Sequence, residues 1–405
     1  MVALWSRLGT QALASANLAW TWMHVTLVLI DGAQQAQYSL VPQALGSGRK
    51  QDLGAVLTSA LAWTCVILLI PICCVWLKLG SIVGAVKTLL DSVAVADGSG
   101  SGGVVKELQI GVETIQSFVN ACLLWVLPYV MSYTIIFWLE CLEIVGLVSV
   151  ISAVWTLARL PIGWYFMFND AVCDDPNGCL NGYAYGFAVA SVGQLLSIIV
   201  IVFMWKKQHL QPEQFWFGFN FKAAAGWALN CRFIAFGAPL ALQAALVAWH
   251  ATLFNMLMAN FGSGQVAGYG VADAITGSGG AVSLSLYAAT SIRVGILLGQ
   301  QKVARAKKAA IAGCVYCGGT GIVEGVLLVL FRHELGELFS PDDELAKELI
   351  VESIWSVATY YFLESVAYGL WAVLEGQMRV QVATVALVVG RESLSAHIWC
   401  VELHF

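Results

Sequence analysis

The chain has 405 residues, of which 59% are hydrophobic and only 11% are charged, and its mean hydropathy is +0.77. Soluble globular proteins carry about 25% charged residues and about 45–50% apolar residues, so this chain lacks the polar surface that a water-soluble fold needs. Its 25 acidic and 20 basic residues leave a net charge of −5, which provides no basic field for nucleic acid. We therefore predict an all-α, multi-pass integral membrane protein that has the lipid bilayer as a partner and no nucleic-acid partner.

A membrane-spanning helix needs about 20 mostly apolar residues, and nine segments of the chain meet this requirement. In chain order they are residues 18–45, 53–77, 113–139, 144–168, 184–205, 233–260, 266–298, 309–331 and 350–374. A tenth apolar segment begins near Val380 and is interrupted by Arg391 and Glu392.

Basic residues in the loops indicate the orientation of these spans. One alternating set of loops holds eleven Lys and Arg residues and the other holds five, and the more basic set is expected on the cytoplasmic side. Cys173 and Cys179 share a short polar loop on the opposite side. An oxidising compartment there would permit a disulfide between them, and two free thiols are the alternative.

The longest polar interruption near mid-chain, residues 206–232, predicts an amphipathic connector that lies at the membrane interface. It separates an N-terminal lobe, residues 1–205, from a C-terminal lobe, residues 233–390. A divergent tail, residues 391–405, follows.

Two short sequence echoes link the lobes. Leu45-Gly46 and the basic turn after it have a counterpart in Leu298-Gly299 and its basic turn, and the residues 138–140 resemble 371–375. Both pairs leave the membrane on the same side. We therefore expect two helical bundles related by a parallel pseudo-twofold repeat, an architecture typical of transporters.

Ionisable groups inside membrane spans are costly to bury and are usually functional. In the first span His24, Asp31, Gln35 and Tyr38 follow at i, i+7, i+11 and i+14. This spacing would place all four on one helical face. We expect this face to line a cavity, with a polar stripe satisfied by neighbouring helices as the alternative.

The last of the nine spans carries Tyr360, Glu364, Tyr368, Trp371 and Glu375 at helical spacing. A carboxylate between aromatic faces suits an organic cation, because ring quadrupoles and a negative charge attract it together. Glu364 could also exchange a proton within the membrane. Plain packing of the aromatic rings is the alternative.

Two further polar residues are candidates for the same cavity. His250 shares a face of the sixth span with Gln243, and a hydrogen-bonded packing role is the alternative. Asp273 lies near the outer end of the seventh span, where a helix-end role is the alternative. The chain contains no GxSxG, HExxH or Walker motif and no Cys/His cluster. We therefore expect no enzyme, no catalytic residue, no metal site and no cofactor.

Several segments resemble the multidrug and toxic compound extrusion (MATE) transporter family. Residues 39–61 resemble its second-helix exit, 289–308 its eighth-helix exit and 361–380 its tenth helix. The matching positions are Gln43, Gly46, Pro239, Trp249, Arg293, Val294, Gly295, Gly299 and Glu364. The resemblance implies a twelve-helix fold, from which this chain would lack the first helix and the last one to two.

The other acidic positions of the family are not matched. Its second-helix acid aligns with Tyr38 and its eighth-helix acid with Ala274, next to Asp273. The acids of its seventh helix align with Val247 and Thr252. Only Glu364 carries over.

The residues and the resemblance together predict a secondary antiporter that exports small-molecule organic cations in exchange for protons. Sodium is the alternative coupling ion, and the plasma membrane and a vacuolar-type membrane fit equally. Glu364 with Tyr360, Tyr368 and Trp371 would bind the cation. The cavity-lining residues would be Asp31, Gln35, His250 and Asp273. The competing hypothesis is a truncated, non-transporting isoform or a structural partner of a complete transporter.

Overall fold

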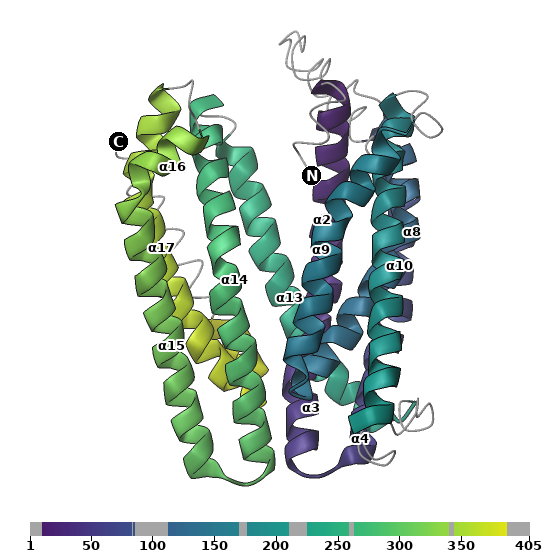
Figure 1. Cartoon of the computed structure of the whole chain (residues 1–405), viewed down its shortest axis with the longest axis vertical. Helices are drawn as coiled ribbons and strands as arrows, with labels where there is room; N and C mark the ends of the chain where they lie inside the picture. The colour runs from purple at the N-terminus through teal and green to yellow at the C-terminus, as the bar shows by residue number, and fades with distance from the viewer. Residues whose placement is uncertain are drawn as a thin grey trace. The chain divides into compact units, whose positions relative to one another are not determined.

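The computed structural model describes residues 10–82, 84–85, 112–169, 176–209, 225–258, 263–339 and 344–386. These residues form helices and no strand (Figure 1), which confirms the all-α class. They fall into two compact units. The first unit comprises residues 1–34 and 57–221, and the second comprises residues 35–56 and 222–405.

The first unit contains α2 (Thr10–Gln34), a π-helical segment η2 (Ala62–Leu68), α5 (Leu69–Trp76), α8 (Val112–Cys141), α9 (Val145–Met167) and α10 (Pro176–His209). The second contains α3 (Ala36–Gly46), α13 (Trp227–Met258), α14 (Ser263–Gly299), α15 (Val303–Leu330), α16 (Arg332–Phe339) and α17 (Glu344–Gly376). Helix α4 (Lys50–Leu61) crosses the division after Val56.

The expected first span is interrupted at one residue, Gln35, so it forms two helices. Helix α2 ends at Gln34 and α3 begins at Ala36, because the Tyr38 amide donates to Gln35 O at 2.9 Å in a tighter i→i+3 turn. Asp31 and Tyr38 consequently belong to different compact units. The segment 35–56 also groups with the C-terminal helices, whereas the sequence had placed it in the N-terminal lobe.

In the described part of the chain, eight helical segments are long and apolar enough to cross a membrane. They correspond to the second to ninth expected spans. Their outer faces are apolar: on α9 the side chains of Val150, Val154 and Leu157 are 61%, 57% and 70% exposed at helical spacing. Such exposed apolar stripes are stable only against lipid.

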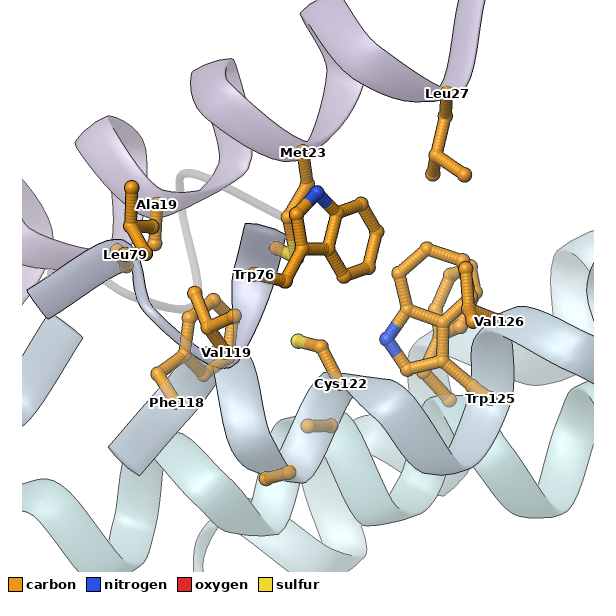
Figure 2. Packing of buried hydrophobic residues seen from close by; sticks show 14 of the residues in the cluster. Ala19, Met23, Leu27, Trp76, Leu79, Phe118, Val119, Cys122, Trp125 and Val126 are labelled. Carbon is orange, nitrogen blue, oxygen red and sulfur yellow. The ribbon is translucent and has the colours of Figure 1, made fainter. Parts of the chain in front are cut away.

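Figure 2 shows the core of the first unit, where Trp76 lies between Met23 of α2 and Cys122 of α8. Trp76 is fully buried, and its indole nitrogen donates to Thr26 Oγ1 at 2.9 Å. The backbone near it is held by Gln116, which donates to Trp76 O at 3.2 Å and accepts from the Gly80 amide at 2.7 Å. These hydrogen bonds join α2, α5 and α8 around one aromatic side chain.

Close packing of α9 against α10 depends on glycine. A Cβ atom on Gly186 would lie 2.8 Å from the Gly163 Cα atom, and one on Gly182 would run into the Phe166 carbonyl oxygen. Small residues allow helix backbones to approach closely in lipid, where no hydrophobic force draws helices together.

In the second unit, α17 packs against both α14 and α15, and Figure 1 shows these three helices side by side. Ser365 of α17 shares a 2.8 Å hydrogen bond with Ser283 of α14. On α15, Gly321 leaves room for Ser365, since a Cβ at Gly321 would lie 2.7 Å from the Ser365 Cβ atom. One serine therefore fixes the crossing of three helices.

The expected repeat is visible in the backbone of four turns. In each turn, the amide of a residue with positive φ donates to the carbonyl oxygen three residues earlier. The amide of the following residue donates to the carbonyl oxygen five residues before itself. The positive-φ residues are Gly48 after α3, Glu143 after α8, Gln301 after α14 and Met378 after α17. The turns after α3 and α14 follow the first pair of similar sequences, and the turns after α8 and α17 follow the second pair.

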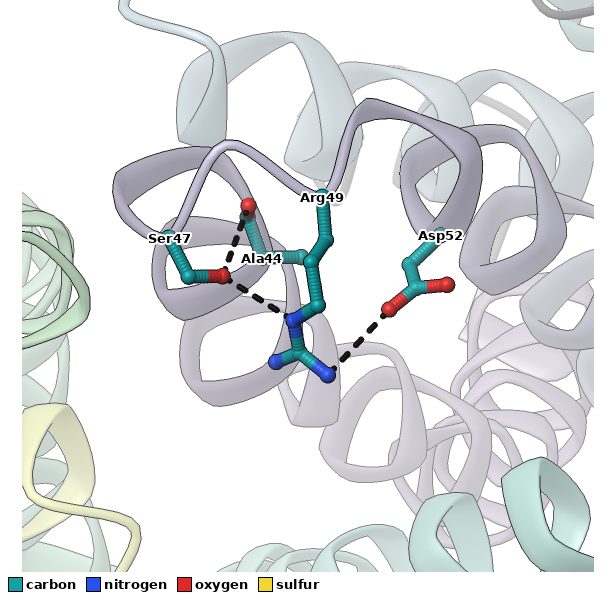
Figure 3. A network of polar contacts seen from close by, with 4 residues as sticks. All are labelled: Ala44, Ser47, Arg49 and Asp52. Carbon is teal, nitrogen blue, oxygen red and sulfur yellow. Dashed lines mark hydrogen bonds and ion pairs between the residues drawn. The ribbon is translucent and has the colours of Figure 1, made fainter.

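Figure 3 shows the turn between α3 and α4 in detail. Arg49 donates from Nε to Ser47 Oγ at 3.0 Å and pairs with Asp52 at 3.3 Å, while Ser47 Oγ donates to Ala44 O at 3.2 Å. Gly48 has a φ of +73°, which glycine adopts without strain. Side chains thus connect the end of α3 to the first turn of α4 around the left-handed residue.

Three predicted features lie partly or wholly outside the described residues. Cys179 takes part in a disulfide, and its expected partner Cys173 lies outside the described part. The middle of the connector, residues 210–224, and the tail, residues 391–405, also lie outside it.

Gly182→Ala should destabilise the first unit, because the added methyl group has only backbone to displace. Overpacking of this kind costs about 1–3 kcal/mol. We expect a lower midpoint of thermal unfolding in detergent. The control is Gly319→Ala on α15, where a Cβ meets nothing within 4 Å, and alanine should leave that midpoint unchanged or higher. Equal midpoints for the two variants would contradict the packing of α9 on α10.

Candidate functional site

The carboxyl group of Glu364 lies on the middle part of α17 and has a neighbour on its own helix. Tyr360, one turn earlier, donates from its hydroxyl to Glu364 Oε1 at 3.0 Å. Both side chains are half-buried. The i, i+4 spacing read from the sequence therefore produces a real contact, and it leaves the carboxyl group within reach of a ligand.

The other two aromatic residues of this stripe gather one to two turns further along. Tyr368 and Trp371 stack with their ring centroids 5.9 Å apart and their planes 9° from parallel. Tyr287 of α14 lies 6.1 Å from the Tyr368 ring and 5.2 Å from the Trp371 ring, and Tyr38 of α3 meets it edge-on at 6.4 Å. We call these four residues the tyrosine–tryptophan cluster.

The sequence predicted that Tyr368 and Trp371 would surround Glu364. In the structure both rings instead pack against Tyr287. Beside Tyr287 lies Glu375, whose side chain is 0% exposed, and the Tyr287 hydroxyl donates to Glu375 Oε2. The other carboxyl oxygen, Oε1, is buried and has no hydrogen-bond partner in the described part of the chain. Glu375 is the most deeply buried acid of the described side chains.

Helix α3 is bound to the end of α17 through two backbone carbonyl groups. Ser39 Oγ donates to Glu375 O at 3.0 Å, and Gln43 Nε2 donates to Gly376 O at 3.1 Å. At the helix end, the Cα atom of Gly299 would lie 3.0 Å from a Cβ on Gly46. Side chains of α3 thus satisfy terminal carbonyl groups of α17 that have no intrahelical partner.

The remaining predicted residues lie on other helices. Asp31 is half-buried on α2 of the first unit and interacts electrostatically with Tyr129 of α8. Gln35 is half-buried at the start of α3, and His250 is half-buried on α13. Asp273 lies on α14 in a stretch whose side chains are outside the described part.

The first unit contains an intramembrane cation, Arg159, at the middle of α9. Its Nη2 donates to Gln194 Oε1 of α10 at 2.7 Å, and its guanidinium carbon lies 4.6 Å from the Phe187 ring centroid and 5.8 Å from that of Tyr129. Gln194 is 1% exposed. Arg159 lies on the face of α9 opposite the exposed apolar stripe, so its charge points into the unit.

Polar groups elsewhere in this unit are also paired across helices. Gln34 donates to Val130 O at 3.1 Å and to Thr134 Oγ1 at 2.9 Å, and Thr134 lies 3.2 Å from Thr64 Oγ1. The last residue of α2 is therefore fixed to α8 and to the π-helical segment. Among the described residues, no group of three His, Cys, Asp or Glu side chains is placed to hold a metal ion.

Comparison with known families identifies the fold. The MatE family model matches residues 1–98 and 239–396, which together make up more than half of the chain. The chain belongs to the MatE family. The resemblance of the sequence to MATE transporters is thereby confirmed.

Individual relatives agree. Multidrug and toxin extrusion protein 2 of Oryctolagus cuniculus is 26% identical over 49% of this chain and 31% of its own length. NorM, a multidrug resistance protein of Vibrio vulnificus, is 26% identical over 54% of this chain and 46% of its own length. A probable NorM of Bradyrhizobium diazoefficiens is 24% identical over 93% of this chain and 75% of its own length. The chain thus spans less than half of the first two relatives.

Solved structures show the same fold. The eukaryotic MATE transporter AtDTX14 has a TM-score of 0.75 at 17% identity, over 95% of this chain and 79% of that chain. A MOP superfamily transporter from Pyrococcus furiosus has a TM-score of 0.73 at 15% identity, over 96% and 79% of the two chains. These values support the two-bundle helical architecture of the MatE fold.

Sequence reasoning singled out Glu364 and missed the importance of Glu375 and Arg159. Glu375 was on the predicted stripe of α17, and Tyr287 lies in the seventh expected span. Nothing in the spacing along either helix indicated that the two faces meet. For Arg159, the usable signal was its position opposite the apolar stripe of α9.

Arg159→Met should lower the unfolding midpoint in detergent, because Gln194 loses its charged hydrogen-bond donor. Hydrogen bonds to charged groups contribute about 1.5–3 kcal/mol. The double variant Arg159→Met/Gln194→Leu should recover part of this loss, since no buried amide is then left without a partner. Arg305→Met, at an exposed position of α15, is the control. A single variant as stable as this control would argue against the pairing.

Proposed function

We propose that this MatE chain carries organic cations out across the membrane in exchange for protons. The printed names of its relatives, multidrug and toxin extrusion protein 2 and the multidrug resistance protein NorM, support an export role. The observation that carries the proposal is the half-buried carboxyl group of Glu364, paired with Tyr360 on a membrane-spanning helix.

The electrostatics of α17 favour a cationic substrate. An ionised Glu364 supplies a negative charge in surroundings of low dielectric constant, where a cation is attracted far more strongly than in water. The Tyr360 hydroxyl donates to the carboxylate and so holds it in place for the ligand. Tyr368, one turn beyond Glu364, adds an aromatic face to which a cation can bind.

Exchange follows from competition for one carboxyl group. A proton and an organic cation both neutralise Glu364, and it cannot hold both. Protonation from the outer side releases the cation there, and loss of the proton to the cytoplasmic side restores the binding charge. A ligand shifts a conformational equilibrium only by its differential affinity for the two states, so the charge of Glu364 is what couples the two movements. Sodium could replace the proton in the same role.

Glu364→Gln should abolish export driven by a pH gradient, because the amide neither binds a proton nor carries a charge. The measurement is efflux of a fluorescent organic cation from proteoliposomes that contain the purified chain. The control is Glu352→Gln at an exposed position of the same helix, which should transport as the unsubstituted chain does. Export by the Glu364 variant at the control rate would refute the proposal.

Tyr360→Phe should keep transport and move its pH profile upward, by about one pH unit or less. The phenol donates to the carboxylate, so its loss weakens the ionised form by the energy of one hydrogen bond. A proton then stays bound at higher pH. The comparison is the pH at which efflux is half-maximal. A profile shifted to lower pH would mean that the phenol stabilises the protonated carboxyl group.

A further inference from the structure

Glu375 is a carboxyl group that the proposed cation exchange at Glu364 does not use. Its side chain is 0% exposed, the Tyr287 hydroxyl donates to Oε2, and Oε1 has no partner among the described residues. An ionised carboxylate has about four lone-pair positions to satisfy. One donor in a fully buried setting leaves most of that requirement unmet.

The groups that face Glu375 offer no compensating positive charge. From α14 and α17 the titratable neighbours are Tyr287 and Tyr368, and from α3 Tyr38 meets the Tyr287 ring. Ser291, one turn beyond Tyr287, places a second buried hydroxyl beside the carboxyl group, and this hydroxyl brings no positive charge.

The nearest charged groups in the sequence are exposed, whereas Glu375 is buried. Arg379, four residues after Glu375, is exposed, and so is Arg293 on α14. From α15, Cys314 and Cys317 face α17 at Gly369, nearly two turns away. In the part of the chain that the structure describes, Glu375 forms no ion pair. A buried charge without an ion pair or several donors is strongly destabilising, and such groups take up or lose a proton to become neutral.

We propose that Glu375 is a second proton-binding site, and that its bound proton keeps α3 packed against α14 and α17. In the neutral form, Oε2 accepts from Tyr287 and Oε1 carries the proton, so no net charge is buried. Release moves that proton to water and leaves a carboxylate. No other reactant is needed.

The packing around Glu375 explains why its charge would act on α3. Ser39 and Gln43 of α3 donate to the backbone carbonyl groups of Glu375 and Gly376. Gly46 meets the α14 backbone at Ile296 and Gly299 so closely that a single methyl group would not fit. A contact this tight has no room for water. An ionised Glu375 must attract water or donors, so α3 has to move away from it.

The site lies at the end of α17 where the basic turns emerge, which the loop charges place on the cytoplasmic side. A proton released from Glu375 therefore has a short route to the cytoplasm. The role of this release in a transport cycle rests on the proposed antiport. The proton site and its effect on α3 do not, and both can be measured without a substrate.

The first measurement is infrared difference spectroscopy of the reconstituted chain during a pH titration. We expect the carbonyl stretch of a protonated carboxyl group in dry surroundings at neutral pH. This band should vanish in Glu375→Gln and persist in Glu364→Gln, which removes the other acid that faces the interior on the same helix. A band that persists in Glu375→Gln would overturn the assignment.

The second measurement is amide hydrogen exchange of residues 36–46 as a function of pH, corrected for the intrinsic exchange rate. In the unsubstituted chain, exchange in α3 should accelerate about tenfold or more above a threshold pH, because ionisation opens the packing. Glu375→Gln should keep α3 protected throughout. A threshold that is unchanged in Glu375→Gln, or absent from the unsubstituted chain, would refute the effect on α3.

Tyr287→Phe tests the same site if Glu375→Gln fails to fold. It keeps the ring in the tyrosine–tryptophan cluster and removes the phenolic donor to the carboxylate, so the threshold should move to higher pH. Tyr316→Phe, at an exposed position of α15, is the matched control and should not move it. A threshold unaffected by Tyr287→Phe would count against Glu375. None of these results depends on transport through Glu364.

Discussion

Contact between helix backbones at glycine is the constraint on which both units depend. In lipid, helices gain little from hiding apolar surface, because the solvent itself is apolar, and close packing and hydrogen bonds hold them together. Gly182 and Gly186 let α10 approach α9, while Gly46 and Gly299 let α3 approach α14. The short interhelical hydrogen bonds of Gln194, Ser365 and Ser39 can form only because the backbones are already that close.

The ionisable side chains inside the membrane have different surroundings in the two units. In the first, Arg159 is held by a buried glutamine and by aromatic faces, so its positive charge persists inside the unit. In the second, Glu375 accepts from the Tyr287 phenol and has no cation beside it among the described residues, so burial favours its neutral form. Glu364 lies between these extremes, since it is half-buried and keeps one donor. A carboxyl group in that intermediate setting is suited to gaining and losing charge during function.

Much of the fold follows from the sequence, because long apolar segments leave a membrane chain few alternatives to helices. The repeat could also be predicted, since a Leu-Gly helix end followed by a basic turn occurs in both halves. Spacing along one helix does not predict which residues of different helices come into contact. Tyr360 and Glu364 are neighbours on one helix and were predicted together, whereas Tyr287 and Glu375 lie 88 positions apart and meet only after packing. The break at Gln35 was missed for a related reason, because no proline or glycine marks that position.

The four repeated turns have a practical consequence for handling this protein. Each requires a left-handed backbone residue, and only Gly48 is a glycine; Glu143, Gln301 and Met378 have φ values of 64°, 59° and 61°. An L-residue with a side chain pays roughly 1–2 kcal/mol for this conformation. Glycine at these three sites would remove that penalty and keep the backbone hydrogen bonds of each turn. The turns therefore offer three independent places to make the chain more robust for purification and crystallisation.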